Sequence, residues 1–329
     1  MKYSFALAAV LSLAALGAEA APVTLRLGHA VFEAHPNHDT AVRFKEAVER
    51  ISNGDVKIEI FPARQLGDVK ELMEGVEMGT IDMTVNSSSA LATMIPAVDA
   101  FQLPGIIPDY AAFAKLAKSP SARAIMDRLE DHDMIALGLY DGGQRHFLTV
   151  KAPVEKIADF KGLKTRVAPV PLFIDIWKEL GTNPTPMAYG EVYSALETGA
   201  LDAVEINLSS IASEKFYEVA KGVTLTGHYF WPSFLLVNKD VFNGLDEEQQ
   251  QAMRQAAAET IEPQVMAVAE LDDKIKANLA EHHIPVITPT PEFNAEMKAV
   301  FAPLVDRYKA KDPLIAAFAD EATELSAQQ

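Results

Sequence analysis

Val23-Thr-Leu-Arg-Leu-Gly28 and Val56-Lys-Ile-Glu-Ile-Phe61 each alternate apolar and polar residues, which is the pattern of a half-buried β-strand. Between them, residues 40–52 place their apolar side chains largely on one helical face. Asp39-Thr40, at the start of this stretch, is the candidate helix cap. A strand, a helix and a second strand in succession form a βαβ unit, in which the strands run parallel. This stretch predicts an α/β fold.

The same patterns continue along the chain. Helices are expected over residues 68–78, 171–180 and 191–198, each followed by a glycine (Gly79, Gly181, Gly199) at the usual position past a C-terminus. Strands are expected over residues 81–85, 134–140, 163–167 and 234–238. Residues 246–282 are almost continuously helix-forming, and Pro263 should kink or end that helix. At about 1.5 Å per residue such a helix is long enough to brace two lobes.

A faint internal repeat also indicates two lobes. Residues 76–83, leading into Asn86-Ser-Ser, resemble residues 196–203, leading into Asn207-Leu-Ser-Ser, although helix ends look alike and chance similarity stays open. Ligands of open parallel sheets gather at the carboxyl ends of the strands, so residues 86–89 and 205–210 should face each other across a cleft. The chain should cross between lobes near Gly142 and Trp231, and the lobes should close on a ligand there.

The expected organisation therefore has three parts. Residues 1–21 are a signal peptide, residues 22–142 with 232–271 form lobe I, and residues 143–231 with 272–329 form lobe II. Lys2, an uncharged run over residues 5–18 and Ala18-Glu-Ala20 make up the expected secretory signal, with cleavage near Ala20 or Ala21. A membrane anchor is the alternative, but the run is shorter than the roughly 18 residues that a spanning helix needs.

Composition limits the function classes. The 329 residues are 49% apolar, contain no cysteine and carry a formal charge of −17. Such acidity argues against nucleic acid or anionic membranes as partners, and the absent cysteine removes disulfides and thiol chemistry. If this acidic protein binds an anion, a few locally placed arginines must do it.

Several segments together resemble a known family. They are Lys57-Ile-Glu-Ile-Phe-Pro-Ala-Arg-Gln-Leu-Gly-Asp68, Gly143-Gln-Arg145, Asp159-Phe-Lys-Gly-Leu-Lys-Thr-Arg166, Gly181-Thr-Asn-Pro-Thr-Pro186, Glu191-Val-Tyr-Ser-Ala-Leu-Glu-Thr-Gly-Ala-Leu-Asp202 and Lys215-Phe-Tyr-Glu-Val219 with Leu225-Thr-Gly-His228. In this order they are similar to the substrate-binding proteins of TRAP (tripartite ATP-independent periplasmic) transporters, the DctP-like family. The resemblance covers nearly the whole chain after the signal.

The resemblance implies a two-lobed α/β periplasmic binding protein, a flytrap with parallel-rich sheets and a long helix bracing both lobes. Its expected ligand is a small organic acid anion (a dicarboxylate, a hydroxy or oxo acid, or a sugar acid), delivered to the membrane subunits of a TRAP transporter. By the resemblance, Arg166 pairs with the ligand carboxylate, Arg145 is a second basic pocket residue, Tyr189 lies against the ligand and Asp68 is a polar pocket residue. Ile206 stands where the family often has asparagine, so the pocket asparagine is either lost to Ile206 or moved to Asn207.

The chemistry of these residues also favours a cleft that binds an organic acid anion. An arginine guanidinium is a planar fork that matches the two oxygens of a carboxylate. Glu205, Asn207, Ser87 and Ser88 follow strands, at the expected cleft. His29, Glu33, His35 and His38 could form a metal site, but His29 and Glu33 fit better as partners for ligand hydroxyls.

Other function classes have weaker support. An enzyme would need a nucleophile, a base and an oxyanion site, and Ser87-Ser-Ser89 lacks the glycine-flanked turn of a nucleophile. The sequence thus predicts no catalysis, no cofactor and no membrane insertion, and a monomer in the periplasm. A scaffold protein, or a binding protein for an ATP-driven importer or a sensory receptor, remains an alternative.

Overall fold

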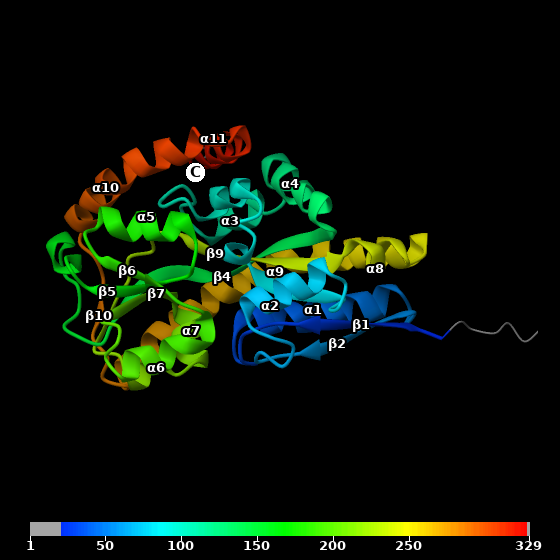
Figure 1. Cartoon of the computed structure of the whole chain (residues 1–329), viewed down its shortest axis with the longest axis horizontal. Helices are drawn as coiled ribbons and strands as arrows, with labels where there is room; N and C mark the ends of the chain where they lie inside the picture. Colours follow the sequence, from blue (N-terminus) through cyan, green and yellow to red (C-terminus); the bar gives the residue numbers. More distant parts are fainter. Residues whose placement is uncertain (1–20, 328–329) are drawn as a thin grey trace, which may run out of the picture.

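One mixed sheet runs through the whole molecule. In the computed structural model, which describes residues 21–327, the main strand order is β2-β1-β3-β9-β4-β7-β5-β6 (Figure 1), and β8 pairs with β4 and with β10. The strands are β1 (Val23–Gly28), β2 (Val56–Phe61), β3 (Met83–Ser87), β4 (Met134–Thr149), β5 (Lys164–Val167), β6 (Asn183–Pro186), β7 (Ala203–Asn207), β8 (Gly222–Thr224), β9 (Phe230–Asn238) and β10 (Val286–Ile287).

The two ends of this sheet are parallel, as the βαβ pattern predicts. Strand β1 pairs in parallel with β2 and with β3, and β5 pairs in parallel with β6 and with β7. The long strands β4 and β9 are antiparallel to each other and to their neighbours β7 and β3. They therefore join two parallel units, one for each expected lobe.

Eleven α-helices are described, and they cover both faces of the sheet. They are α1 (Pro36–Ile51), α2 (Val69–Glu77), α3 (Tyr110–Leu116), α4 (Pro120–Met126), α5 (Pro171–Glu179), α6 (Val192–Glu197), α7 (Leu208–Ser213), α8 (Lys239–Asn243), α9 (Glu247–Glu281), α10 (Pro291–Lys309) and α11 (Pro313–Ala327). The short 3₁₀ helices include η1 (Ser88–Ala90) and η2 (Pro96–Gln102). The glycines after α2, α5 and α6 have positive φ angles, which confirms their capping role.

Helix α1 begins earlier than the sequence pattern predicts. Its N-cap is His35, whose Nδ1 accepts a hydrogen bond from the Asn37 amide, and Pro36 occupies the first turn. Asp39 and Thr40 lie inside the helix and do not cap it. The expected cap at these two residues was wrong because proline at the first helical position fixed the start four residues upstream.

Helix α9 braces both halves of the molecule, and it does so without a break. It runs from Glu247 to Glu281 with Pro263 inside it, so the helix does not end at that proline, and the alternative that Pro263 kinks it stays a prediction. The helix packs against α1, α3 and β4 and then against α7 and β10 (Figure 1). It thus contacts elements of both expected lobes.

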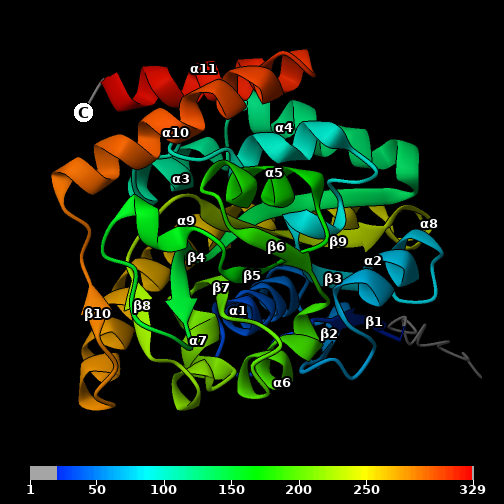
Figure 2. The same ribbon diagram turned by 60° about the vertical axis from the view of Figure 1, so that its left-hand side comes forward.

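The C-terminal helices form an outer strap, seen across the top of Figure 2. Helix α10 packs on α5, whereas α11 packs on α3, α4 and η2. The lobe boundaries remain a proposal, and these contacts favour assigning residues 313–327 to lobe I instead of the expected lobe II. The remainder of residues 272–329 stays with lobe II.

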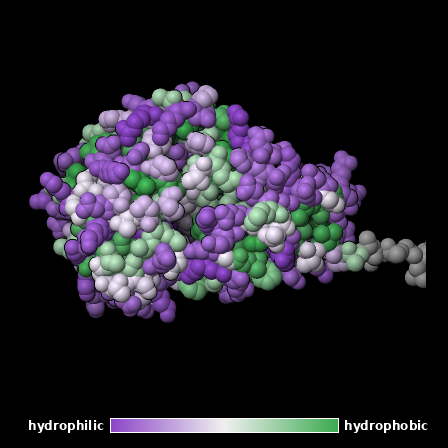
Figure 3. All heavy atoms as spheres, in the orientation of Figure 1, coloured by the Kyte–Doolittle hydropathy of each residue, from purple (hydrophilic) through white to green (hydrophobic). Residues whose placement is uncertain are grey.

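Hydrophobic side chains fill one large core and a smaller one under α6 and α7 in lobe II. The face in Figure 3 is mostly hydrophilic, with hydrophobic residues in scattered groups. Phe32, Met78 and Met266 are large hydrophobic side chains that stay exposed. The expected signal peptide, up to residue 20, lies outside the described residues.

Candidate functional site

The two crossings between lobes lie side by side in the sheet. Strands β4 and β9 pair from Met134 to Gln144, with a register shift after Asp141. Strand β4 does not end at the glycines, as the sequence suggested, but continues to Thr149. Gly142 lies against the Trp231 ring, where a Cβ would come within 2.3 Å of Cε3, and Gly143 has a φ of 110°. Both positions therefore require glycine, and a hinge at these crossings stays a prediction.

Arg166 is a buried cation without a carboxylate partner. It lies on β5 with 4% of its surface exposed, and its Nε and Nη2 both donate to the Met187 carbonyl at 3.1 and 2.8 Å. No described residue forms a salt bridge with it. Burial lowers the pKa of Arg166 to about 10, although Glu205 acts in the opposite direction. The side chain is therefore charged at neutral pH and held in one orientation, with donors left for an anion.

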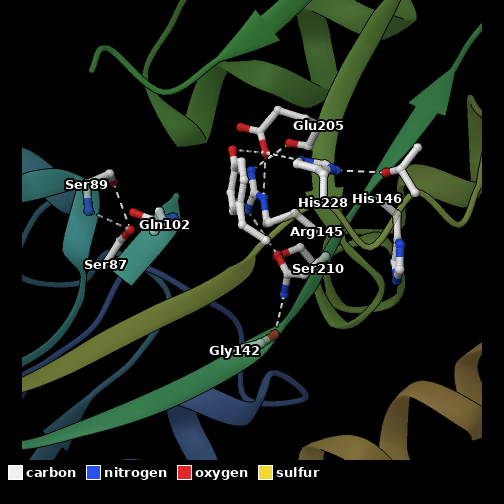
Figure 4. Close-up of polar contacts among 12 residues, drawn as sticks. Ser87, Ser89, Gln102, Gly142, Arg145, His146, Glu205, Ser210 and His228 are labelled. Carbon is white, nitrogen blue, oxygen red and sulfur yellow. Dashed lines mark hydrogen bonds and ion pairs between the residues drawn. The ribbon is translucent and has the colours of Figure 1, made fainter. Parts of the chain in front are cut away.

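Arg145 has a different environment, because each of its three guanidinium nitrogens already donates a hydrogen bond. Its Nε donates to Glu205 Oε2 at 2.6 Å, Nη2 donates to the Glu205 carbonyl at 2.6 Å, and Nη1 donates to Asn207 Oδ1 at 3.3 Å (Figure 4). The hydroxyl of Tyr229 also donates to Glu205 Oε2 at 3.0 Å. Burial acts to lower the pKa of Arg145, but the adjacent Glu205 outweighs it and the pKa is raised. This ion pair lies within the expected lobe II, and the centre of the Trp231 ring lies 5.7 Å from the Arg145 guanidinium.

Asn207 and His35 connect the two lobes behind that pair. His35 Nδ1 accepts from Asn37, so the neutral ring carries its proton on Nε2, which lies 3.2 Å from Ser210 Oγ and 3.3 Å from Ser209 Oγ. Burial lowers the pKa of His35 to about 3, with His29 and Arg145 adding to the effect, so the ring is neutral. Ile206 lies in the core of lobe II, whereas the buried Asn207 side chain bonds to Arg145, Ser210 and the Gly142 carbonyl. Its expected role in place of Ile206 stays a prediction.

The other expected residues divide between the two sides of the cleft. Tyr189 donates to Ser210 Oγ at 3.0 Å in lobe II. Asp68 caps α2 in lobe I, and its Oδ2 accepts from the Gly190 amide of lobe II at 3.0 Å. The structure thus brings these two residues to the same region as Arg166, and the negative charge of Asp68 acts to raise the pKa of Arg166.

The lobe I candidates are mostly occupied by local contacts. Ser87 caps η1, Ser88 donates to Gln102 Oε1, and His29 Nε2 lies 3.0 Å from His38 Nδ1. Glu33 is exposed on the loop after β1 and makes no hydrogen bond with a described residue. Figure 4 shows Ser87, Ser89 and Gln102 apart from the Arg145–Glu205 pair.

Comparison with known proteins places this geometry in a family. The profile described as bacterial extracellular solute-binding protein, family 7 (DctP) matches residues 27–312. The chain belongs to this family. It is 34% identical over 265 residues, 80% of this chain and 81% of the relative, to the 2,3-diketo-L-gulonate-binding periplasmic protein YiaO of Escherichia coli.

Two further relatives show the range of the family. The C4-dicarboxylate-binding periplasmic protein DctP of Rhodobacter capsulatus is 30% identical over 256 residues, 78% of this chain and 76% of that protein. The structure of the sugar acid binding protein DctPAm from Advenella mimigardefordensis, in complex with galactonate, superposes with a TM-score of 0.88 at 27% identity, covering 92% of this chain and 99% of that one. The expected two-lobed TRAP-type fold is confirmed.

Two of the three arginines at the cleft of this family 7 protein form salt bridges with glutamates. Arg145 is paired with Glu205, and Arg64 is paired with Glu214 at 3.2 Å, so Arg166 is the buried arginine left over among residues 21–327. On the lobe I side, burial lowers the pKa of His29 to about 4, which makes that ring neutral. The buried amide nitrogen of Gln102 and Nδ1 of His29 have no partner among the described residues.

Neither a metal centre nor a membrane span is found in the described part. Residues 21–327 contain no group of three or more metal-ligating side chains, and the histidines after β1 contact each other and lobe II instead. None of the helices in this range combines the length and apolarity of a membrane-crossing segment.

Proposed function

We propose that this chain captures a small organic acid with one carboxylate and several hydroxyls, and delivers it to the membrane subunits of a TRAP transporter. The observation that carries the proposal is Arg166, a buried guanidinium held by the Met187 carbonyl that forms no salt bridge with residues 21–327. Its remaining donors suit a carboxylate, and closing the lobes over it would exclude water. Family membership supports the transport role and the periplasmic location, with signal cleavage near Ala20 or Ala21 as part of the proposal.

The number of carboxylates follows from the charge balance. Arg145 and Arg64 are each neutralised by a glutamate, and Asp68 adds a negative charge near Arg166. A second carboxylate on the ligand would therefore be buried without a partner. The polar groups on the lobe I side, such as Gln102 and His29, are uncharged and suit hydroxyls instead. This favours a sugar acid over a dicarboxylate, and it involves no catalytic step.

A matched ligand panel tests the proposal. Aldonates, the aldarates with the same configuration and the corresponding uncharged alditols share one carbon skeleton and differ only in the number of carboxylates. We expect the tightest binder to be a monocarboxylate. The second carboxylate of its aldarate should cost about 2 kcal/mol or more, roughly 30-fold in affinity, because a charged group would be buried unpaired. The alditol should not bind measurably.

Isothermal titration calorimetry on the purified chain gives these affinities, and succinate serves as a C4-dicarboxylate comparison. An aldarate or succinate that binds as tightly as the best monocarboxylate would contradict the proposal that the ligand carries one carboxylate. An alditol that binds as tightly as the best acid would contradict the proposed anion site altogether.

A further inference from the structure

The loop after β2 has an unusual backbone. Ala63 and Arg64 are consecutive non-glycine residues in the left-handed region, with φ angles of 51° and 65°. This conformation is unfavourable for residues with a Cβ and persists only where surrounding contacts impose it. The contacts are present, since the Ala63 amide donates to the Val31 carbonyl and the Arg64 amide donates to the His29 carbonyl. The loop is thereby fixed to the carboxyl end of β1, at the cleft.

The strained conformation directs the Arg64 side chain from lobe I to lobe II. Its Nη1 donates to the Ala30 carbonyl at 2.8 Å, and its Nη2 donates to Glu214 Oε2 of lobe II at 3.2 Å. The guanidinium also lies between two rings, 5.2 Å from the centre of Phe32 in lobe I and 5.7 Å from the centre of Tyr189 in lobe II. Phe32 is 43% exposed, so this stack stands at the edge of the cleft.

The buried carboxylate of Glu214 is stabilised by its ion pair with Arg64. Its side chain is only 9% exposed, and Oε1 has no hydrogen-bond partner among residues 21–327. Burial raises the pKa of the Glu214 carboxyl, and Arg64 counteracts the rise. Moving the lobes apart would return both charges to water, so the ion pair belongs to the closed arrangement.

The far end of the same loop makes a second bridge. Asp68 Oδ2 accepts a hydrogen bond from the Gly190 amide, next to Tyr189. A Cβ on Gly190 would lie 3.3 Å from Asp68 Oδ2 and 3.5 Å from Arg64 Cδ, so the glycine permits this close approach. Residues 64–68 of lobe I therefore hold the 189–190 segment of lobe II at two points.

We propose that Arg64, with Glu214 as its partner, is a latch that holds the closed lobes together and sets the rate of ligand release. This inference rests on the proposed function, because it requires a ligand enclosed between the lobes. Arg64 already has its partners and acts as a positioning residue, apart from the ligand carboxylate. A contact present only in the closed state slows dissociation and leaves association nearly unchanged.

Stopped-flow kinetics on four variants test the latch: Arg64→Gln, Glu214→Gln, the double variant and Arg43→Gln as a control. Arg43 pairs with Asp39 inside α1, within lobe I. The probe is whichever panel compound the wild type binds most tightly. We expect each single latch variant to release it about tenfold faster, with association changed by less than about threefold. The double variant should release the probe no faster than the single variant with the higher release rate. The Arg43→Gln control should release it at the wild-type rate.

A thermal denaturation series separates a latch from an ordinary structural contact. We expect the latch variants to keep the wild-type melting temperature without ligand and to lose part of the ligand-induced increase. Release rates within about twofold of wild type in both single variants would overturn the latch. So would slower association with unchanged release, or an equal loss of stability with and without ligand. If the tightest probe is an alditol, the anion site fails while the release rates still decide the latch.

Discussion

Replacing Arg166 with alanine should weaken ligand binding by roughly 30-fold to several-thousand-fold. Removing one partner of a buried charge pair costs about 2–5 kcal/mol, because the other charge stays buried and unpaired, and about 1.4 kcal/mol corresponds to tenfold in affinity. Arg166→Lys should lose much of the affinity as well, since an ammonium group cannot present the planar fork. Calorimetry with the tightest panel compound measures both effects.

The matched control is Arg26→Ala. Arg26 lies on β1 and pairs with Asp82 on the surface, where its side chain is 45% exposed. This variant should bind like wild type. The ligand-free Arg166→Ala protein should also unfold cooperatively, because Arg166 forms no salt bridge with residues 21–327 and donates only to the Met187 carbonyl there. Near-wild-type affinity in folded Arg166→Ala would mean that the carboxylate binds elsewhere.

The second large effect concerns stability. Glu205→Ala should reduce the free energy of unfolding by about 3–5 kcal/mol, because Arg145 is 5% exposed and would keep its charge without a counter-ion. Tyr229 would also lose the acceptor of its hydroxyl. Urea denaturation of the ligand-free protein, followed by circular dichroism, gives the difference.

The double variant Arg145→Met with Glu205→Leu provides the comparison. It removes both charges and replaces them with apolar side chains, so it should be less destabilised than Glu205→Ala. If Glu205→Ala loses less than about 1 kcal/mol, the pair contributes little to the fold and Arg145 has another role. Arg145 would then return as a candidate for direct ligand contact, as the sequence suggested.

Much of the fold follows from local patterns in the sequence. The alternation in β1 and β2 and the glycines after α2, α5 and α6 are local signals, and the structure bears them out. The start of α1 was missed although Pro36 signals it, because Asp39 and Thr40 are more usual caps. Pro263 does not end α9, because the effect of a proline on a helix depends on its surroundings. It lies on the exposed side of α9, where water can satisfy the carbonyl freed one turn earlier.

The contacts of the candidate site could not be predicted from the sequence. It names Arg166 and Arg145 as ligand-binding candidates, and that role stays a prediction. Only the fold shows that Glu205, about 60 residues away, pairs with Arg145, and that Arg166 forms no salt bridge with residues 21–327. The role of His35 between the lobes depends on its burial against Ser210. Arg64 had no signal, because a left-handed backbone at two ordinary residues cannot be read from local patterns.

The central claim is that the ligand carboxylate binds Arg166 between closed lobes. A crystal structure of the chain with its tightest panel acid tests this most directly. The account predicts a carboxylate oxygen about 3 Å from a nitrogen of the Arg166 guanidinium, with the Nε–Met187 contact kept. It also predicts no second carboxylate within reach of Arg145 or Arg64. A ligand whose carboxylate lies away from Arg166, or on Arg145 with Glu205 displaced, would contradict the account.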